Sequence, residues 1–226
     1  MNPDGKIINF LDRLGDLFIL NIVYLVSCIP IVTIGAATTA LYYNTLKMAE
    51  NREGYVWRDY WKSFKQNFKQ ATIIWMIMLI FIVVLGVDAV LSGGFSESLG
   101  SVVALTVIVL GILLIMTGVY VFPVLARFDN TIKNTIKNAF IMAIRHLPST
   151  ILIVILHGVP LLLALASIQV FIRGVLVVLL FIVSILAYLQ SKLFSRVFSN
   201  YYPKGEDYDY ANYSKGGLRS WLKKQK

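Results

Sequence analysis

Long apolar stretches separated by short basic segments set the strongest limit on what this chain can fold into. Four clear stretches run over about 71–91, 102–124, 150–167 and 174–193, and an earlier one extends over 17–46. Each of the four approaches or reaches the roughly 20 residues that cross a bilayer as a helix. Backbone groups in lipid have no water to bond, so spanning segments of this kind are helical. We therefore predict an all-α, polytopic membrane protein.

The composition agrees with a lipid environment. Of the 226 residues, 58% are hydrophobic, whereas soluble domains have about 45–50% apolar residues. The formal net charge is +9, although only 15% of residues are charged. These charges lie between the apolar stretches, which is the pattern of cytoplasmic membrane loops rather than of a nucleic-acid-binding surface. A single cysteine excludes an internal disulfide and a cysteine-rich metal site.

The first apolar stretch is too long for one straight span and contains a break at Pro30–Gly35. We divide it into helices over about 17–29 and 36–48, which gives about six hydrophobic segments. A hairpin is our preferred interpretation, and the alternatives are one tilted span or a re-entrant second helix. Residues 1–198 then form one helical transmembrane domain, and residues 199–226 form a basic, tyrosine-rich tail.

The basic segments predict the orientation in the membrane. Lysine and arginine gather in 47–70, in 126–147 and in the tail, whereas the opposite loops hold few charges. Because cytoplasmic loops are enriched in lysine and arginine, we expect these three segments in the cytoplasm. If the first stretch is a hairpin, the N-terminus is cytoplasmic too.

Two cytoplasmic stretches have the pattern of amphipathic helices that lie along the membrane surface. In the first, Trp57 and Trp61 share a face with two phenylalanines, and Lys65 and Lys69 lie around another face. In the second, Lys133 and Lys137 lie opposite an apolar face. Lipid contact alone explains this composition, and docking of a cytoplasmic partner is the alternative. Their similar order of residues fits either an internal repeat or convergence at the interface.

Three polar residues in or beside the spans are candidates for intramembrane function. Asp88 lies near the outer end of its segment, and Arg173 lies at a similar depth in another. A structural ion pair between them is the simpler interpretation, and a proton or ion site is the alternative. His157 lies within a segment, followed by Gly158 and Pro160. We favour a histidine bonded to a neighbouring helix over one that lines a transport path.

The loop after Pro123 contains Arg127 and Asp129, which we expect to anchor it as an ion pair. Catalytic signatures are absent: the sequence has no His-Glu-x-x-His, no Gly-x-Ser-x-Gly and no phosphate-binding glycine loop with lysine. We therefore expect no enzyme activity, no catalytic or metal-binding residues and no cofactor.

Several motifs together resemble the YesL family of bacterial membrane proteins, a domain-of-unknown-function family. They cover nearly the whole chain in order: 30–43 (PIVTIGAATTALYY), 52–61 (REGYVWRDYW), 64–71 (FKQNFKQA), 122–130 (FPVLARFDN), 137–140 (KNAF) and 145–148 (RHLP). The resemblance implies a bacterial plasma membrane protein, and it supplies no catalytic residues. Members of this family often lie beside genes for carbohydrate ABC importers and their sensor systems.

This association leads to our functional expectation. The chain would be an accessory protein of carbohydrate uptake or its sensing, which contacts an importer permease or a sensor kinase through its two basic surface helices. The alternative is a small autonomous transporter or channel, and a membrane enzyme is the least favoured. The bilayer itself is an expected partner, and nucleic acid is not.

Overall fold

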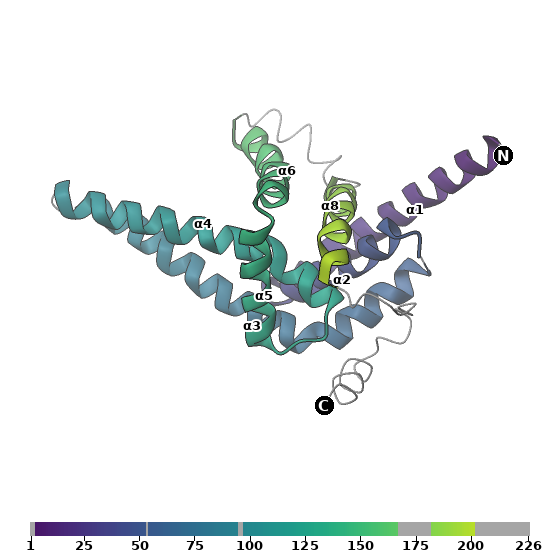
Figure 1. Cartoon of the computed structure of the whole chain (residues 1–226), viewed down its shortest axis with the longest axis horizontal. Coiled ribbons are helices and arrows are strands. Elements are labelled where there is room, and N and C mark those ends of the chain that lie inside the picture. Colours follow the sequence, from purple (N-terminus) through teal and green to yellow (C-terminus); the bar gives the residue numbers. More distant parts are fainter. Residues whose placement is uncertain (1–2, 53, 95–96, 167–181, 202–226) are drawn as a thin grey trace.

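The computed structural model describes residues 3–52, 54–94, 97–166 and 182–201, and within these ranges it is helical with no strand. The helices meet near the middle of the molecule and spread away from one another (Figure 1). In chain order they are α1 (Pro3–Ser27), η1 (Ile31–Thr33), α2 (Ile34–Ala49), α3 (Val56–Leu91), η2 (Ser92–Gly94), α4 (Glu97–Arg127), α5 (Ile132–Arg145), α6 (Leu147–Ala166), α8 (Val183–Phe198) and η4 (Ser199–Tyr201).

Helices α1 and α2 form an antiparallel hairpin. The chain leaves α1 at Ser27 and turns at Pro30, where Thr33 Oγ1 donates hydrogen bonds to the carbonyl oxygens of Ser27 and Pro30 at 2.5 and 2.6 Å. At the other end of the hairpin, Arg13 donates to Asn51 Oδ1 at 2.7 Å. The middle of α1 therefore lies beside the C-terminal end of α2, and the turn around Pro30 forms the tip.

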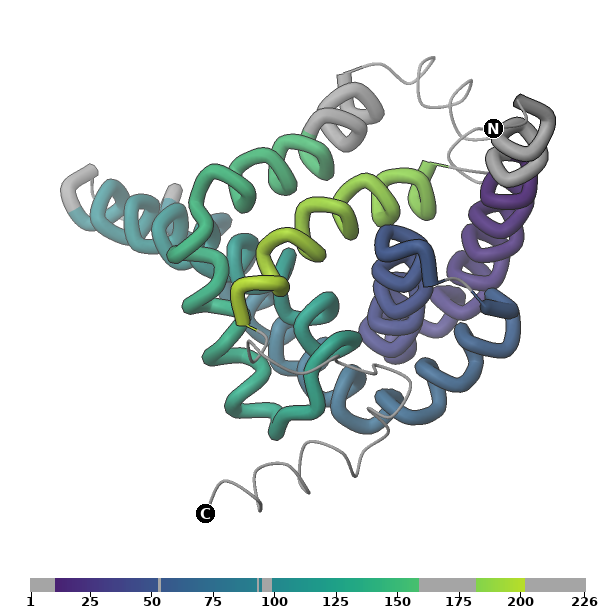
Figure 2. The backbone as a smooth tube through the Cα atoms, turned by 45° about the vertical axis from the view of Figure 1, so that its right-hand side comes forward, coloured from purple at the N-terminus to yellow at the C-terminus, as the bar shows by residue number. Residues whose placement is uncertain are grey.

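Helix α2 is the central element of the fold. Eleven of its sixteen residues are buried, and it lies among α1, α3, α4 and α8 (Figure 2). Gly35 lets α2 approach the backbone of α3 closely, because a Cβ at this position would lie 2.5 Å from the carbonyl oxygen of Ala71. At about 24 Å for sixteen residues, α2 is shorter than the roughly 30 Å hydrocarbon core. The eleven buried residues show that the surrounding helices cover most of α2.

Helix α4 and the second half of α3 form a long antiparallel arm that leaves the rest of the molecule (Figure 1). The whole helices α3 and α4 contain 36 and 31 residues, or about 54 and 46 Å. Trp75 and Phe122 are in contact at the base of the arm, with ring centroids 6.4 Å apart. Further out, hardly any of either apolar stretch is buried within the chain. Both helices are long and apolar enough to cross a membrane.

Helices α5 and α6 are bent relative to each other by 101° at His146. Thr131 caps α5, because its side chain accepts a hydrogen bond from the Asn134 backbone N–H at 3.4 Å. Such caps commonly stabilise a helix by about 1 kcal/mol. If this bent pair counts as one span, the described residues contain three candidate spans, and otherwise two.

These findings confirm the all-helical class. The sequence predicts about six hydrophobic segments, whereas the described residues contain two or three candidate membrane spans. The predicted spans at 71–91 and 102–124 lie within the two arm helices. The predicted span at 36–48 corresponds to the protein-covered α2. The stretch that holds Trp57 and Lys65 is not a separate surface helix, since it is the first half of α3. Part of the predicted span at 174–193 and most of the tail lie outside the described residues.

Candidate functional site

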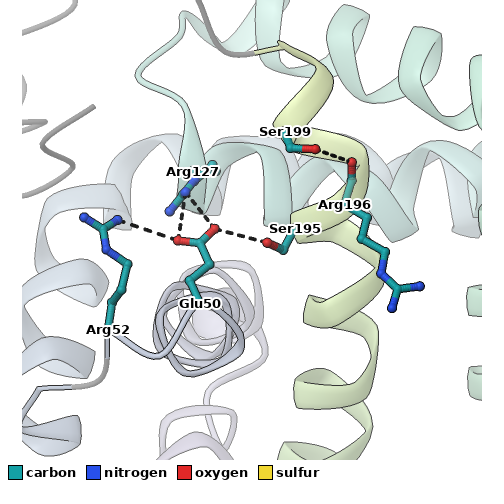
Figure 3. Close-up of polar contacts among 6 residues, drawn as sticks. All are labelled: Glu50, Arg52, Arg127, Ser195, Arg196 and Ser199. Carbon is teal, nitrogen blue, oxygen red and sulfur yellow. Dashed lines mark hydrogen bonds and ion pairs between the residues drawn. The ribbon is translucent and has the colours of Figure 1, made fainter. Parts of the chain in front are cut away.

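A cluster of charged and polar side chains lies where the ends of α2, α4 and α8 meet. It consists of Glu50, Arg52, Arg127 and Ser195, and we call it the Glu50 junction (Figure 3). Glu50 follows the last turn of α2, where the helix dipole disfavours negative charge. A carboxylate at this position therefore requires cations or hydrogen-bond donors from neighbouring elements.

Arg127, in the last turn of α4, supplies the main cation. Its Nη2 donates to both carboxylate oxygens of Glu50, at 2.8 and 3.0 Å. The side chains of Arg127 and Glu50 are only 9% and 15% exposed. Charge-assisted hydrogen bonds are roughly twice as strong as neutral ones, and partial burial limits screening by salt. This pair joins two helices whose residues are 77 positions apart in the chain.

Arg52 and Ser195 complete the junction. The Ser195 hydroxyl donates to Glu50 Oε1 at 3.3 Å, which adds α8 to the pair. An Arg52 guanidinium nitrogen lies 3.7 Å from Glu50 Oε2. By contrast, Arg196 points away from the carboxylate (Figure 3). The junction thus includes Ser195 of α8 but not the adjacent Arg196, and it joins three helix ends.

The backbone turn after α2 is what returns Arg52 toward Glu50. Asn51 adopts a left-handed conformation with φ of 54°. The backbone N–H groups of Asn51 and Arg52 donate to the carbonyls of Met48 and Lys47 at 3.1 and 2.9 Å. This is the hydrogen-bond pattern of a Schellman helix end, in which asparagine takes the position usually held by glycine. Lys47 also pairs with Asp59, which ties the end of α2 to the start of α3.

A second set of polar contacts joins α2, α6 and α8. The Tyr42 hydroxyl donates to Gln190 Oε1 at 2.5 Å, and Gln190 Nε2 lies 3.0 Å from His157 Nδ1. We call these three residues the Tyr42 chain. Tyr42 and Gln190 are buried. One turn further along α2 and at the adjacent position of α8, the hydroxyls of Thr45 and Ser191 are 2.7 Å apart.

The order of these contacts shows how α2 and α8 run. Tyr42, Thr45 and Glu50 of α2 contact positions 190, 191 and 195 of α8. The residue numbers increase in the same order on both sides of these contacts, so the two helices run in the same direction. Interhelical hydrogen bonds between buried polar groups contribute about 0.6 kcal/mol each in one membrane protein, and three successive contacts fix the register. The arrangement holds the helices in one relative position.

The structure distributes the residues predicted from the sequence among several places. Arg127 belongs to the Glu50 junction, whereas we had expected it to pair with Asp129, which is exposed. His157 is exposed, and its Nδ1 lies 3.0 Å from Gln190 Nε2 of α8. Asp88 is half-buried near the end of α3, and its suggested partner Arg173 lies outside the described residues.

The candidate contact residues on the basic helices are mostly exposed. Exposed side chains include those of Trp57, Lys65, Lys69, Lys133 and Lys137, and Trp61 is half-buried. Sequence reasoning missed Glu50, Ser195, Gln190 and Tyr42. A weak signal existed for Glu50, since it is an acidic residue at the start of a basic segment directly after an apolar stretch.

Comparison with known families gives one match. Residues 17–89 match the model of a family described as a protein of unknown function, DUF624. The matched region contains the second half of α1, all of α2 and nearly all of α3, and therefore includes Glu50 but not Arg127 or Ser195. Neither the comparison with curated proteins nor that with solved structures gave a match.

Proposed function

We propose that this protein is an accessory membrane protein of carbohydrate uptake or its sensing. It would act by contact with a carbohydrate ABC importer permease or a sensor kinase in the bacterial plasma membrane. The uptake context rests on the motifs that resemble the YesL family. The mode of action rests on the surface of α5.

The outward face of α5 is the observation that supports a contact role. Thr135, Ala139, Met142 and Ala143 are buried against the rest of the chain. The other side exposes Lys133 and Lys137 together with Phe140, Ile141 and Ile144, which are 37%, 41% and 45% exposed. Within the part of the chain that the structure describes, the packing of α5 buries the opposite side of the helix and leaves this face exposed.

The α1–α2 hairpin supports a cytoplasmic position of the N-terminal side. Arg13 lies against Asn51, so the chain enters and leaves the hairpin at the same end. The segment that follows, 54–70, contains four basic residues and belongs to a predicted cytoplasmic segment. Together these observations favour cytoplasmic basic loops with the N-terminal side of α1 among them.

The test is gentle purification of the tagged full-length protein from its native host, followed by mass spectrometry. We expect a permease or a sensor kinase to accompany the protein, and we expect the double variant Lys133→Glu/Lys137→Glu to lose it. Lys192→Glu/Arg196→Glu is the control, since it reverses two exposed charges on α8. Absence of a partner under conditions that preserve a known complex would contradict the proposal, and so would unchanged oligosaccharide uptake after deletion of the gene.

A small autonomous transporter is the second candidate, and the Tyr42 chain is the observation that favours it. Tyr42 and Gln190 are buried and hydrogen-bonded to each other, and they lead to the exposed His157. Polar side chains of this kind in a helical membrane protein can line a transport path. Purified protein in liposomes should then move a sugar or an ion, and His157→Leu should abolish that flux. Failure across a broad panel of sugars and ions would remove this candidate.

A further inference from the structure

The first half of α3 presents three distinct stripes of side chains. One stripe is buried against the rest of the chain and consists of Val56, Tyr60, Ser63, Ala71 and Ile74. We call the two others the outer stripes: one is aromatic, half-buried at Trp61 and Phe64 and exposed at its ends, and the other is basic and exposed. Each outer stripe repeats at spacings of four, three and four residues, which places its members on one side of a helix.

The aromatic stripe forms a continuous ladder of rings. Trp57, Trp61, Phe64 and Phe68 follow one another with centroid distances of 5.9, 5.4 and 5.5 Å. Trp57 is 59% exposed and Phe68 is 40% exposed, so the two ends of the ladder are open to the surroundings. Offset and edge-on ring contacts at these distances favour a defined arrangement. The ladder thus forms a continuous aromatic surface along one side of this half-helix.

The basic stripe lies one residue, or about 100°, further around the helix. Its members are Arg58, Lys62, Lys65 and Lys69, and all four are exposed. By the same rotation, this stripe points almost directly away from the buried stripe. Asp59 is the one acidic residue in 56–70, and it pairs with Lys47. Among the described residues 56–70, the outer surface of this half-helix therefore has a net positive charge.

The continuity of α3 fixes where this surface lies. The same helix continues without a break into the apolar stretch Ala71–Leu91, which is long enough to cross the hydrocarbon core. Gln70 Nε2 donates to the carbonyl oxygen of Asn130 at 2.9 Å, which ties this point of α3 to the loop after α4. The two outer stripes therefore directly precede the apolar stretch of α3 and end at the level where the loop after α4 contacts this helix.

We propose that the two outer stripes form a binding surface for the headgroups of anionic phospholipids. Tryptophan and phenylalanine lie favourably at the level of the headgroups. The adjacent lysines and arginine reach the phosphate and the negative surface of the leaflet, with about a fivefold gain in affinity for each basic residue near the surface. The proposal is independent of the accessory function, because it concerns lipid and not a protein partner.

Native mass spectrometry of the full-length protein tests the proposal in mixed micelles that contain equal amounts of phosphatidylglycerol and phosphatidylcholine. The retained ratio of the two lipids is the readout. We expect the wild-type protein to prefer phosphatidylglycerol, and Lys65→Gln/Lys69→Gln to reduce this preference at least fivefold. Trp57→Ser should reduce the retention of both lipids.

The matched control is Lys192→Gln/Arg196→Gln, which also removes two exposed charges one turn apart, on α8. It should keep the wild-type preference, and equal melting temperatures will show that all variants are folded. An unchanged preference in Lys65→Gln/Lys69→Gln would overturn the proposal, as would an equal loss in the control. If the stripe variant keeps its lipid ratio but loses a co-purified protein, the surface binds a protein instead.

Discussion

Replacement of Arg127 by methionine tests whether the Glu50 junction holds the helix ends together. Methionine keeps much of the length and apolar area of the arginine stem but removes the charge. Glu50 would then lose its two shortest hydrogen bonds, at 2.8 and 3.0 Å, while it remains 85% shielded from solvent, since its side chain is 15% exposed. The variant therefore leaves a largely buried carboxylate at the unfavourable end of a helix dipole.

The magnitude follows from what remains around Glu50. Loss of one partner from a buried ion pair costs roughly 3–5 kcal/mol. Arg52, at 3.7 Å, and the Ser195 hydroxyl, at 3.3 Å, stay in place and compensate part of this loss. We expect the free energy of unfolding to fall by about 2–3 kcal/mol. For a chain of this size, that corresponds to a decrease of about 4–12 °C in melting temperature.

The assay is thermal unfolding of the purified protein in one detergent at one scan rate, because membrane proteins commonly unfold irreversibly. Arg196→Met is the matched control, since this exposed arginine points away from Glu50 and its loss should change little. Glu50→Gln and the double variant complete a cycle, and the double variant should lower the melting temperature by less than the sum of the two single variants. If Arg127→Met and Arg196→Met melt at the same temperature, the junction does not stabilise the fold and our argument is wrong.

Three further predictions concern the packing of α2. Gly35→Ala should lower the free energy of unfolding by about 1–3 kcal/mol, because the added Cβ would lie 2.5 Å from the backbone oxygen of Ala71. Gly86 has open space around it, so Gly86→Ala should be neutral or stabilising. The melting temperatures of the two variants test this difference. Asn51→Gly and Asn51→Val both remove the hydrogen bond from Arg13, so the difference between them reports on the backbone turn. Because φ is 54° there, Asn51→Val should melt lower than Asn51→Gly by an amount equivalent to about 1–2 kcal/mol, and equal melting of the two would contradict a left-handed turn. Gln190→Leu should cost about 1–3 kcal/mol, since it leaves the Tyr42 hydroxyl buried without its acceptor, and Tyr42→Phe should restore part of that loss in a double variant.

The sequence predicts the arm well, because its signal is local. An uninterrupted apolar run of about 20 residues is sufficient to expect a membrane-spanning helix, and 71–91 and 102–124 lie within the two helices that meet this condition. The spacing of the aromatic and basic residues before Ala71 is also a local signal, and it predicts the helix that the structure has there. What the sequence did not reveal is that this segment and the span form one helix, since nothing in the pattern marks the absence of a turn.

The sequence predicts the centre of the fold less well, because hydropathy measures apolar character and not what covers it. Residues 36–48 are apolar enough to suggest a membrane segment, yet α1, α3, α4 and α8 surround them. The partner of Arg127 shows the same limit. Asp129 is two residues away and was the natural choice, whereas Glu50 is 77 positions away and reaches Arg127 only through the packing of α2 on α4. Such contacts depend on tertiary structure that no local pattern encodes.

The unbroken course of α3 has a mechanical consequence. Because one helix joins the surface half around Lys65 to the apolar half that ends at Leu91, the two halves move together. The part beyond Ala71 is about 30 Å long, so a tilt of 10° about that point would displace its far end by about 5 Å. If α3 crosses the membrane, a pull on its surface half would be transmitted along the helix past the point where Ala71 contacts Gly35, and so toward the far end at Leu91.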